Sequence, residues 1–270
     1  MRFLKRKYRR IPIYIFGYHK GGTTLFRKIF REFCDLNNKK FLALPGKQTH
    51  IPQNADVILF PHSLIDLSLI SEPFLGVHTI RDPRDIVVSG YLYHRRTNEK
   101  WCVNSDFVVK HPIMFPQVPY SQEYRSEDWK MKYLNSLNGM SYQNNLLNMS
   151  QYDGLFFEMN NYGTWTIESM DKWDYNNENI LEIRFEDVMN NFGEIFKMIF
   201  EHLRFSKSEI KQGINIAAKH DLNRKSKAEI ARIKHVSSPK ASKWKDYFET
   251  RHIETFGQKF GDIMLKLGYE

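Results

Sequence analysis

Short apolar runs alternate along this chain with stretches of helical periodicity, and turn residues separate the two kinds of segment. The runs at 11–16, 56–60, 74–80 and 180–185 have the length and the β-branched or aromatic content of buried strands. Because such runs alternate with helical patterns, the sequence predicts an α/β fold, a central parallel sheet flanked by helices. No repeat, low-complexity tract or linker interrupts the pattern, so we expect residues 1–270 to form a single domain.

The expected helices carry their apolar residues on one face. Helical spacing predicts a helix over 24–35 and one long amphipathic helix over 186–203. Asp82 and Pro83 should open a helix after the third strand, because Asp is a favoured cap and Pro suits the first helical position. From residue 206 onward, the pattern predicts mainly short helices.

Composition and charge narrow the class of protein. With 41% hydrophobic and 14% aromatic residues, 270 residues can build a sizeable core, which excludes a disordered chain. Cys34 and Cys102 lie far apart, which argues against a disulfide framework or a structural zinc site. No apolar run approaches the roughly 20 residues of a membrane helix, and the run after the basic N-terminus is too short for a signal peptide. We therefore expect a soluble, cytoplasmic protein.

The net charge of +9 attracts anions, whether nucleic acid, a membrane surface or a phosphorylated small molecule. The turn after the first strand favours the last of these. Residues 17–24 read Gly-Tyr-His-Lys-Gly-Gly-Thr-Thr and lead directly into a helix, so backbone N–H groups and the positive helix end are available to an anion. A plain glycine-rich turn is the alternative.

This turn differs from the P-loop of nucleoside triphosphatases. Its glycine spacing fits the start of that motif, but Thr23 stands where the motif requires lysine, and the lysine, Lys20, lies inside the turn. The strand at 56–60 runs into Pro-His and not into a magnesium-binding Asp, and Asp82 is placed as a helix cap. The loop therefore predicts a phosphate-like ligand and no dedicated metal.

A second motif follows the third predicted strand. Arg81 stands at the carboxyl end of that strand, where open α/β sheets bind ligands, and a guanidinium can hold a phosphate through two N–H groups. Ser89 lies eight residues later, one helical turn after Asp85, and offers a hydroxyl on the same predicted helix. These residues indicate a second phosphate contact.

Four segments, in this order, resemble the motifs of sulfotransferases that use 3′-phosphoadenosine 5′-phosphosulfate (PAPS). Residues 20–24 (KGGTT) are similar to that family's 5′-phosphosulfate loop, and residues 81–89 to its 3′-phosphate motif. Residues 181–188 (LEIRFEDV) resemble its Leu-Arg-Tyr-Glu-Asp-Leu segment, and 244–248 (WKDYF) its C-terminal Trp-Lys element. The resemblance implies a P-loop-like sulfotransferase architecture and transfer of a sulfuryl group from PAPS to a small-molecule acceptor, with adenosine 3′,5′-bisphosphate (PAP) as the product.

The resemblance also implies roles for individual residues. The residues implied for the nucleotide site are Lys20, Gly21, Gly22, Thr23, Thr24, Leu25, Arg81, Ser89, Phe185 and Lys240. The glycine backbone and threonine hydroxyls would hold the 5′-phosphate, Lys20 would contact the oxygen that bridges phosphate and sulfate, and Arg81 with Ser89 would hold the 3′-phosphate.

Three positions depart from the family pattern. Leu25 replaces a tryptophan near the adenine, and Phe185 replaces a tyrosine, so the phenolic hydroxyl is lost. Residues 237–239, Ser-Ser-Pro, replace Arg-Lys-Gly, so Lys240 or Lys243 would have to supply the charge there. The family's dimerisation sequence is not reproduced, which leaves the oligomeric state open.

Transfer to a hydroxyl requires a group that accepts its proton, and histidine suits neutral pH. His62 stands just past the strand at 56–60, close to the family's catalytic histidine, although the lysine that accompanies it there is absent. We therefore name His62 and Lys20 as the catalytic candidates. His19, His50, His94 and a carboxylate base are the alternatives, and no metal is implied.

Two other functions compete with this hypothesis. A P-loop kinase-like enzyme would need a lysine after Gly22 and a magnesium carboxylate. A nucleic-acid-binding protein would need a basic stripe with exposed aromatics, whereas the basic residues are distributed apart from 5–10 and 224–234. We expect neither nucleic acid nor membrane as a partner. The aromatic segments 101–133 and 142–173 suit a sugar, phenol, alcohol or amine equally, and packing in the core is the alternative role for many of their aromatic residues. The stretch 101–120, rich in proline and aromatic residues, is typical either of a lid or binding loop or of an ordinary surface loop.

Overall fold

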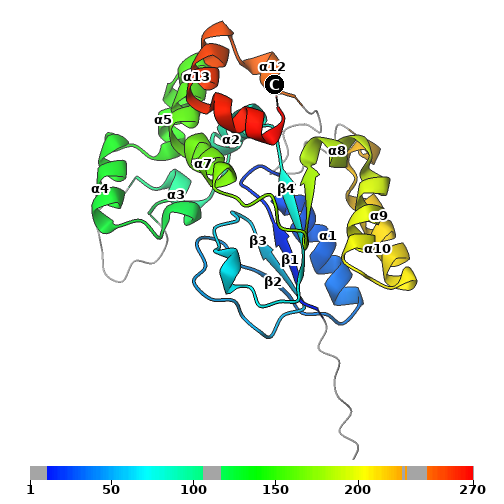
Figure 1. The fold of residues 1–270 in the computed structure, drawn as a ribbon. Helices are drawn as coiled ribbons and strands as arrows, with labels where there is room; N and C mark the ends of the chain where they lie inside the picture. Colours follow the sequence, from blue (N-terminus) through cyan, green and yellow to red (C-terminus); the bar gives the residue numbers. More distant parts are fainter. Residues whose placement is uncertain (1–10, 106–116, 227–228, 230–241, 270) are drawn as a thin grey trace, which may run out of the picture.

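The computed structural model describes residues 11–105, 117–226, 229 and 242–269, and its centre is a five-stranded parallel sheet (Figure 1). The strands are β1 (Ile13–Phe16), β2 (Phe41–Ala43), β3 (Val57–Phe60), β4 (Leu75–Ile80) and β5 (Ile180–Arg184), in the order β2-β3-β1-β4-β5. Every neighbouring pair is parallel. Helices flank this parallel sheet, which confirms the predicted α/β class.

The described helices lie in two groups. In chain order they are α1 (Thr23–Leu36), α2 (Pro83–His94), α3 (Lys100–Val103), α4 (Glu127–Ser136), α5 (Tyr142–Asn148), α6 (Gln151–Glu158), α7 (Thr164–Asp171), α8 (Phe185–Asn190), α9 (Phe192–His202), α10 (Lys207–His220), α12 (Trp244–Tyr247) and α13 (Thr250–Leu267). A π-helical turn, η3 (Met159–Gly163), joins α6 to α7, and short 3-10 turns are η1 (Leu67–Leu69), η2 (Tyr120–Gln122) and η4 (Leu222–Arg224). Figure 1 shows α1, α9 and α10 on one side of the sheet, and α2, α5, α7 and α13 together at the upper left, next to the end of β4 that leads into α2.

The sheet is buried on both faces because successive strand residues point to opposite sides. Ile13 and Ile15 belong to a cluster with apolar side chains of α1, α9 and α10. Tyr14 and Phe16 face the other way, and the ring of Phe16 lies 5.0 Å from that of Trp173, centroid to centroid. This packing fixes the carboxyl ends of the strands at one edge of the sheet.

Three predictions about the elements were wrong in detail. The edge strand β2 was not predicted, because it is only three half-buried residues long. The expected single helix over 186–203 is two helices, α8 and α9, separated by Asn191, whose φ of −131° and ψ of 48° are not helical. Asparagine side chains compete for backbone hydrogen bonds, which explains the break in a continuous apolar stripe. Phe185, expected at the end of a strand, begins α8 instead.

The C-terminal quarter of the chain also differs from the expected short helices. Helix α10 has 14 residues and α13 has 18. The apolar stripe of α13 packs into the cluster of helices around α2, so tertiary burial sustains a helix that the local pattern did not clearly indicate. In the part of the chain that is described, no helix is both long and apolar enough to cross a bilayer. Residues 106–116, the centre of the expected lid, and Lys240 lie outside the described residues.

Candidate functional site

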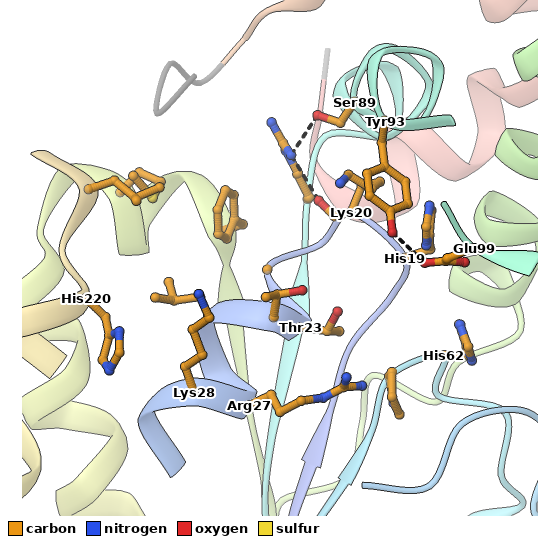
Figure 2. Close-up of a pocket in the computed structure, with 18 of the residues that line it drawn as sticks. His19, Lys20, Thr23, Arg27, Lys28, His62, Ser89, Tyr93, Glu99 and His220 are labelled. Carbon is orange, nitrogen blue, oxygen red and sulfur yellow. Dashed lines mark hydrogen bonds between the residues drawn. The ribbon is translucent and has the colours of Figure 1, made fainter. Parts of the chain in front are cut away.

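A cavity of about 660 Å³ opens at the carboxyl ends of the strands (Figure 2). Most of the residues singled out from the sequence line it: Lys20, Gly22, Thr23, Thr24, Leu25, His62, Arg81, Ser89 and Phe185. Gly21 is buried in the adjoining turn. The fold therefore gathers side chains that follow β1, β3, β4 and β5 at one opening, as expected for a parallel α/β sheet.

The turn between β1 and α1 can adopt its shape because Gly22 is a glycine. Its φ of +97° lies in the left-handed region, and a Cβ at this position would fall 2.6 Å from the ring of Phe185. Gly22 occupies the N-cap position of α1, and no side chain in the described part of the protein caps this helix. Its first N–H groups therefore remain available to an anion at the mouth of the cavity.

Lys20 projects from the same turn into the cavity. Its Nζ lies 4.0 Å from the centroid of the Tyr93 ring. Burial, together with the nearby positive charges of Arg81, Lys243 and Arg96, lowers the pKa of Lys20 to about 7. Several cations thus converge on one place, an arrangement that an anionic ligand would stabilise.

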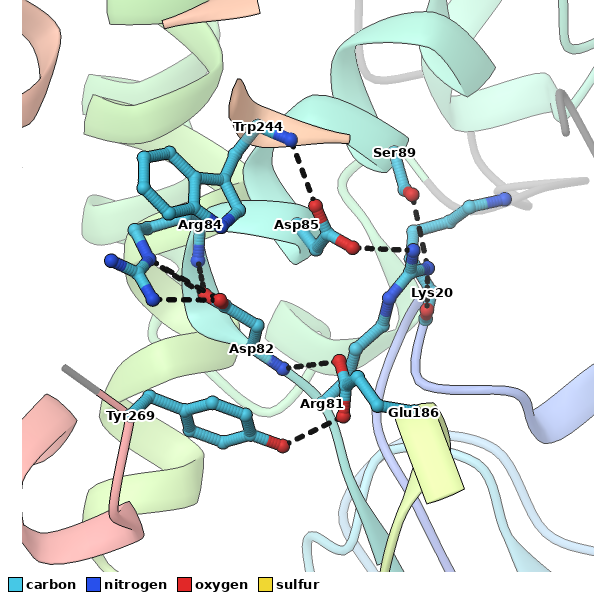
Figure 3. Close-up of polar contacts among 9 residues, drawn as sticks. All are labelled: Lys20, Arg81, Asp82, Arg84, Asp85, Ser89, Glu186, Trp244 and Tyr269. Carbon is cyan, nitrogen blue, oxygen red and sulfur yellow. Dashed lines mark hydrogen bonds and ion pairs between the residues drawn. The ribbon is translucent and has the colours of Figure 1, made fainter. Parts of the chain in front are cut away.

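Arg81 connects the turn to helix α2 (Figure 3). Its Nη1 donates to the carbonyl oxygen of Lys20 at 2.9 Å and to Ser89 Oγ at 3.0 Å, and its Nη2 donates to Asp85 Oδ2 at 3.0 Å. The other oxygen of Asp85 accepts a hydrogen bond from the Trp244 N–H at 2.9 Å. The sequence predicts Arg81 at the end of a strand and Ser89 on the helix that follows, and the structure brings these two side chains into contact. Arg81 is therefore fixed before any ligand arrives.

Lys243 comes from the C-terminal segment and is buried beside this network. It lines the cavity, and burial with the charge of Arg81 lowers its pKa to about 8. The sequence left Lys240 and Lys243 as alternatives for the missing positive charge near Arg81. Of these two, Lys243 is the residue that the described part of the structure places in the cavity.

Asp82 is a helix cap, as its position beside a proline predicted. Its carboxylate accepts from the Arg84 N–H at 2.9 Å and pairs with the Arg84 guanidinium at 2.8 Å. Arg84 in turn lies over the Trp244 ring, 3.9 Å from its centroid. The N–H of Asp82 donates to Glu186, whose other oxygen accepts from the hydroxyl of Tyr269 (Figure 3). Asp82 thus anchors α2 to the C-terminal elements.

His62 lines the opposite part of the cavity, but its hydrogen bonding was not foreseen. Its Nδ1 accepts a hydrogen bond from the N–H of Gly46 at 3.1 Å. Burial lowers the pKa of His62 to about 4. Because a backbone N–H only donates, Nδ1 carries no proton, and the neutral ring is protonated on Nε2. In this arrangement, His62 can donate a hydrogen bond to a ligand through Nε2. The sequence predicts instead that His62 accepts a proton as a base.

The rival histidines occupy different places. His19 lines the cavity and stacks on His94, with ring centroids 5.0 Å apart and planes 4° from parallel. His94 is wholly buried and pairs with Glu158 at 2.9 Å. His50 is exposed and is not among the residues that line the cavity.

Sequence reasoning missed Glu99 and Arg27. Glu99 lies in an Arg-Arg-Thr-Asn-Glu-Lys stretch that resembles a solvated charge run, yet it lines the cavity and accepts hydrogen bonds from Tyr93 and Trp101. Tyr93 follows Ser89 by one helical turn, so the 3.6-residue period could have indicated it. Arg27 follows Thr23 by the same spacing on α1. Its Nε is buried and has no hydrogen-bond partner among the described residues.

The residues that line the cavity can be divided by the roles that the sequence hypothesis would give them. We call Lys20, Gly22, Thr23, Thr24, Leu25, Arg81, Ser89, Phe185 and Lys243 the donor half, and Arg27, Pro45, His62, Glu99, Tyr120 and Tyr162 the acceptor half. Tyr93 lies between them, because its ring faces Lys20 and its hydroxyl faces Glu99. The donor half is rich in positive charge, whereas the acceptor half mixes both signs with aromatic rings.

Comparison with known proteins bears on the fold. No family model matches the chain, and no curated protein matches its sequence. Among solved structures, the mouse sulfotransferase SULT7A1 complexed with PAP is similar over 95% of this chain and 84% of that chain, at 15% identity and a TM-score of 0.50. Retinol dehydratase in complex with androsterone and the inactive cofactor PAP is similar over 95% of this chain and 81% of that chain, at 14% identity and a TM-score of 0.47. The chain has a sulfotransferase-like fold.

Proposed function

We propose that this protein transfers the sulfuryl group of PAPS to a hydroxyl or amine of a small-molecule acceptor and releases PAP. The observation that carries the proposal is the donor half of the cavity. A helix N-terminus that no side chain of the described residues caps, Lys20 and the fixed Arg81 meet there. The fold of the chain is similar to that of a sulfotransferase solved with PAP.

In this proposal the two phosphate groups of the donor are bound by different elements. The N–H groups at the start of α1 and the hydroxyls of Thr23 and Thr24 hold the 5′-phosphate. Arg81 and Ser89 hold the 3′-phosphate with Lys243, and Lys240 remains a proposed addition to that site. Leu25 and Phe185 supply apolar contacts for the adenine. The positive charges of Lys20, Arg81 and Lys243 suit a ligand that carries several negative charges, as PAPS does.

Lys20 and His62 are the proposed catalytic residues. The ammonium group of Lys20 stabilises the negative charge that develops on the phosphate as the sulfuryl group leaves. His62 acts on the acceptor. As the sequence hypothesis has it, His62 removes the acceptor's proton, and this requires the ring to give up the hydrogen bond that Nδ1 accepts from Gly46 or to turn over. Positioning by the cavity supplies the remaining rate enhancement.

Calorimetric titration with PAP tests the nucleotide site. Arg81→Ala should weaken PAP binding by about 1.5–3 kcal/mol, the range for hydrogen bonds to a charged group. Binding of 5′-AMP, which lacks the 3′-phosphate, should weaken much less. Equal losses for both nucleotides, or a wild-type protein that does not bind PAP, would contradict the assignment.

Native mass spectrometry of the protein mixed with PAPS, ATP with magnesium, and an oligonucleotide separates the competing functions. Selective retention of PAPS or PAP supports sulfuryl transfer. Retention of ATP and magnesium would favour a kinase-like enzyme, and retention of the oligonucleotide would favour a nucleic-acid-binding protein. Release of PAP from PAPS in the presence of glucose, phenol or benzyl alcohol would then begin to define the acceptor.

A further inference from the structure

The tautomer of His62 raises the question of which group accepts the acceptor's proton. Gly46 N–H donates to His62 Nδ1 at 3.1 Å, so the neutral ring carries its proton on Nε2. Burial lowers the pKa of His62 to about 4, which favours this neutral form near pH 7. While this contact holds, the ring can donate a hydrogen bond through Nε2 but has no free nitrogen lone pair with which to remove a proton.

Glu99 is the acidic side chain that lines the same cavity in the described structure. Its Oε1 accepts a hydrogen bond from the Tyr93 hydroxyl at 2.5 Å, and its Oε2 accepts one from Trp101 Nε1 at 2.5 Å. Tyr93 and Trp101 are themselves buried, so the carboxylate is held in one orientation. Because each carboxylate oxygen can accept about two hydrogen bonds, each retains capacity for a proton from a ligand.

The position of Glu99 relates it to both halves of the cavity. Figure 2 shows Glu99 and His62 on the side of the cavity away from His220, with the Arg27 side chain reaching toward them. The charge of Glu99 favours the protonated form of His62 and of Arg27, against the burial that disfavours it. The charge of Glu99 likewise favours the protonated form of Lys20 and opposes the lowering of its pKa by burial. Glu99 is therefore electrostatically coupled to the donor lysine and to the acceptor-side groups at once.

We propose that Glu99, in place of His62, is the general base of the transfer and that His62 donates a hydrogen bond from Nε2 to the reacting groups. The inference rests on the proposed sulfuryl transfer. Glu99 takes the proton of the acceptor hydroxyl, and the acceptor oxygen forms a bond to sulfur with the electron pair so released. The bond between sulfur and the 5′-phosphate oxygen breaks, and its electron pair stays on the phosphate beside Lys20.

Two substitutions separate the roles of Glu99 and His62. Glu99→Gln keeps the shape of the side chain and one hydrogen-bond acceptor but removes the base, so turnover of PAPS should fall by about 10²–10⁴-fold. His62→Gln retains an N–H donor near the position of Nε2, so its turnover of PAPS should fall by less than about tenfold. The turnover of His62→Ala, which has no such donor, should fall further. The probes are glucose, phenol, benzyl alcohol and water as acceptors, with PAP release as the readout.

Controls distinguish a base from a residue that only supports the fold. Tyr93→Phe removes one hydrogen bond to Glu99 but leaves the carboxylate and the aromatic ring beside Lys20. Its turnover of PAPS should therefore fall by less than about tenfold. Formate, a small carboxylate, should restore part of the turnover of Glu99→Ala, while chloride at equal ionic strength should not. The Kd for PAP should stay within about twofold of wild type in the Glu99→Gln protein.

The outcomes also separate this inference from the proposed function. If wild type binds PAP and turns over PAPS, and Glu99→Gln does so at an unchanged rate, Glu99 is not the base and sulfuryl transfer stands. The same conclusion follows if His62→Gln is as inactive as His62→Ala while formate rescues nothing. If the wild-type protein neither binds PAP nor releases it from PAPS with any of the four acceptors, both the proposed function and the inference fail.

Discussion

The two halves of the cavity hold their polar groups by different means. In the donor half, Arg81 is fixed by hydrogen bonds to the Lys20 carbonyl, Ser89 and Asp85, and the glycine turn presents backbone N–H groups that no side chain of the described protein caps. In the acceptor half, Arg27 has a buried Nε without a hydrogen-bond partner among the described residues. The polar groups of the donor half are therefore already held in place. In the acceptor half, the N–H group at Arg27 Nε remains available for a hydrogen bond to a ligand.

The halves also differ in how the chain builds them. The donor half is assembled largely from two strand-turn-helix units, β1–α1 and β4–α2, in which the strand and the helix fix the turn between them. The acceptor half takes single side chains from α1, from the turn after β3, from the start of α3 and from η2. This contrast fits a reaction in which one substrate is constant and the other is specific to the enzyme.

Within the donor half, the largest expected effect follows from the role proposed for Lys20. Lys20→Met keeps an aliphatic stem over the Tyr93 ring but removes the charge, and turnover of PAPS should fall by about 10²–10³-fold, as on loss of an oxyanion-stabilising group. Because Lys20 acts on the donor, the loss should be the same for glucose, phenol and water as acceptors. Steady-state measurements with each acceptor test this. Losses that differ more than tenfold between acceptors would place Lys20 functionally in the acceptor half and break the comparison.

The same contrast explains how much the sequence could predict. Residues 17–24 and 81–89 are contiguous, and the geometry of a turn between a strand and a helix is local, so Lys20, Arg81 and Ser89 could be placed without a structure. The sheet and the capped start of α2 were predictable for the same reason.

Glu99 could not be found in this way. It stands in a polar stretch whose pattern is that of an exposed surface, and only the packing of Tyr93 and Trp101 turns it toward the cavity. The tautomer of His62 was equally hidden, because it depends on Gly46, sixteen residues earlier in the chain. Contacts between distant segments carry no local signal, and this applies to most of the acceptor half.

A smaller effect should appear when pH is varied. In the ligand-free protein, the pKa of Lys20 is lowered to about 7 and that of Lys243 to about 8, in both cases chiefly by burial. A bound phosphate would raise both pKa values, so PAP binding above pH 7 should be accompanied by proton uptake. The Kd should therefore increase about ten- to hundredfold between pH 7 and pH 9, since a pKa shift of one unit corresponds to tenfold in affinity. Below about pH 6, protonation of the phosphates themselves should weaken binding again.

Calorimetry in two buffers of different ionisation enthalpy measures this proton uptake directly. Lys20→Arg is the matched control, because arginine stays charged over this range and its variant should show a shallower dependence on pH. Because the charge of Glu99 favours the protonated form of Lys20, Glu99→Gln should lower the pKa of Lys20 further and shift the pH dependence of PAP binding to lower pH. A Kd that does not vary between pH 7 and pH 9 would mean that both lysines are already charged in the free protein. Burial and the neighbouring positive charges would then not lower the pKa of Lys20 and Lys243 as expected.

The smallest expected effect is the response to a chelator. In nucleotide-dependent enzymes of the kinase type, a magnesium ion held by a carboxylate neutralises the phosphates. Here the carboxylate at the corresponding strand end, Asp82, is paired with Arg84 at 2.8 Å, and the positive charge of the donor half comes from Lys20, Arg81 and Lys243. These side chains can balance the donor's charge themselves, so turnover of PAPS should change by less than about twofold in excess EDTA. A loss of activity that magnesium restores would contradict the assignment of charge neutralisation to these three residues, and it would favour the kinase-like alternative.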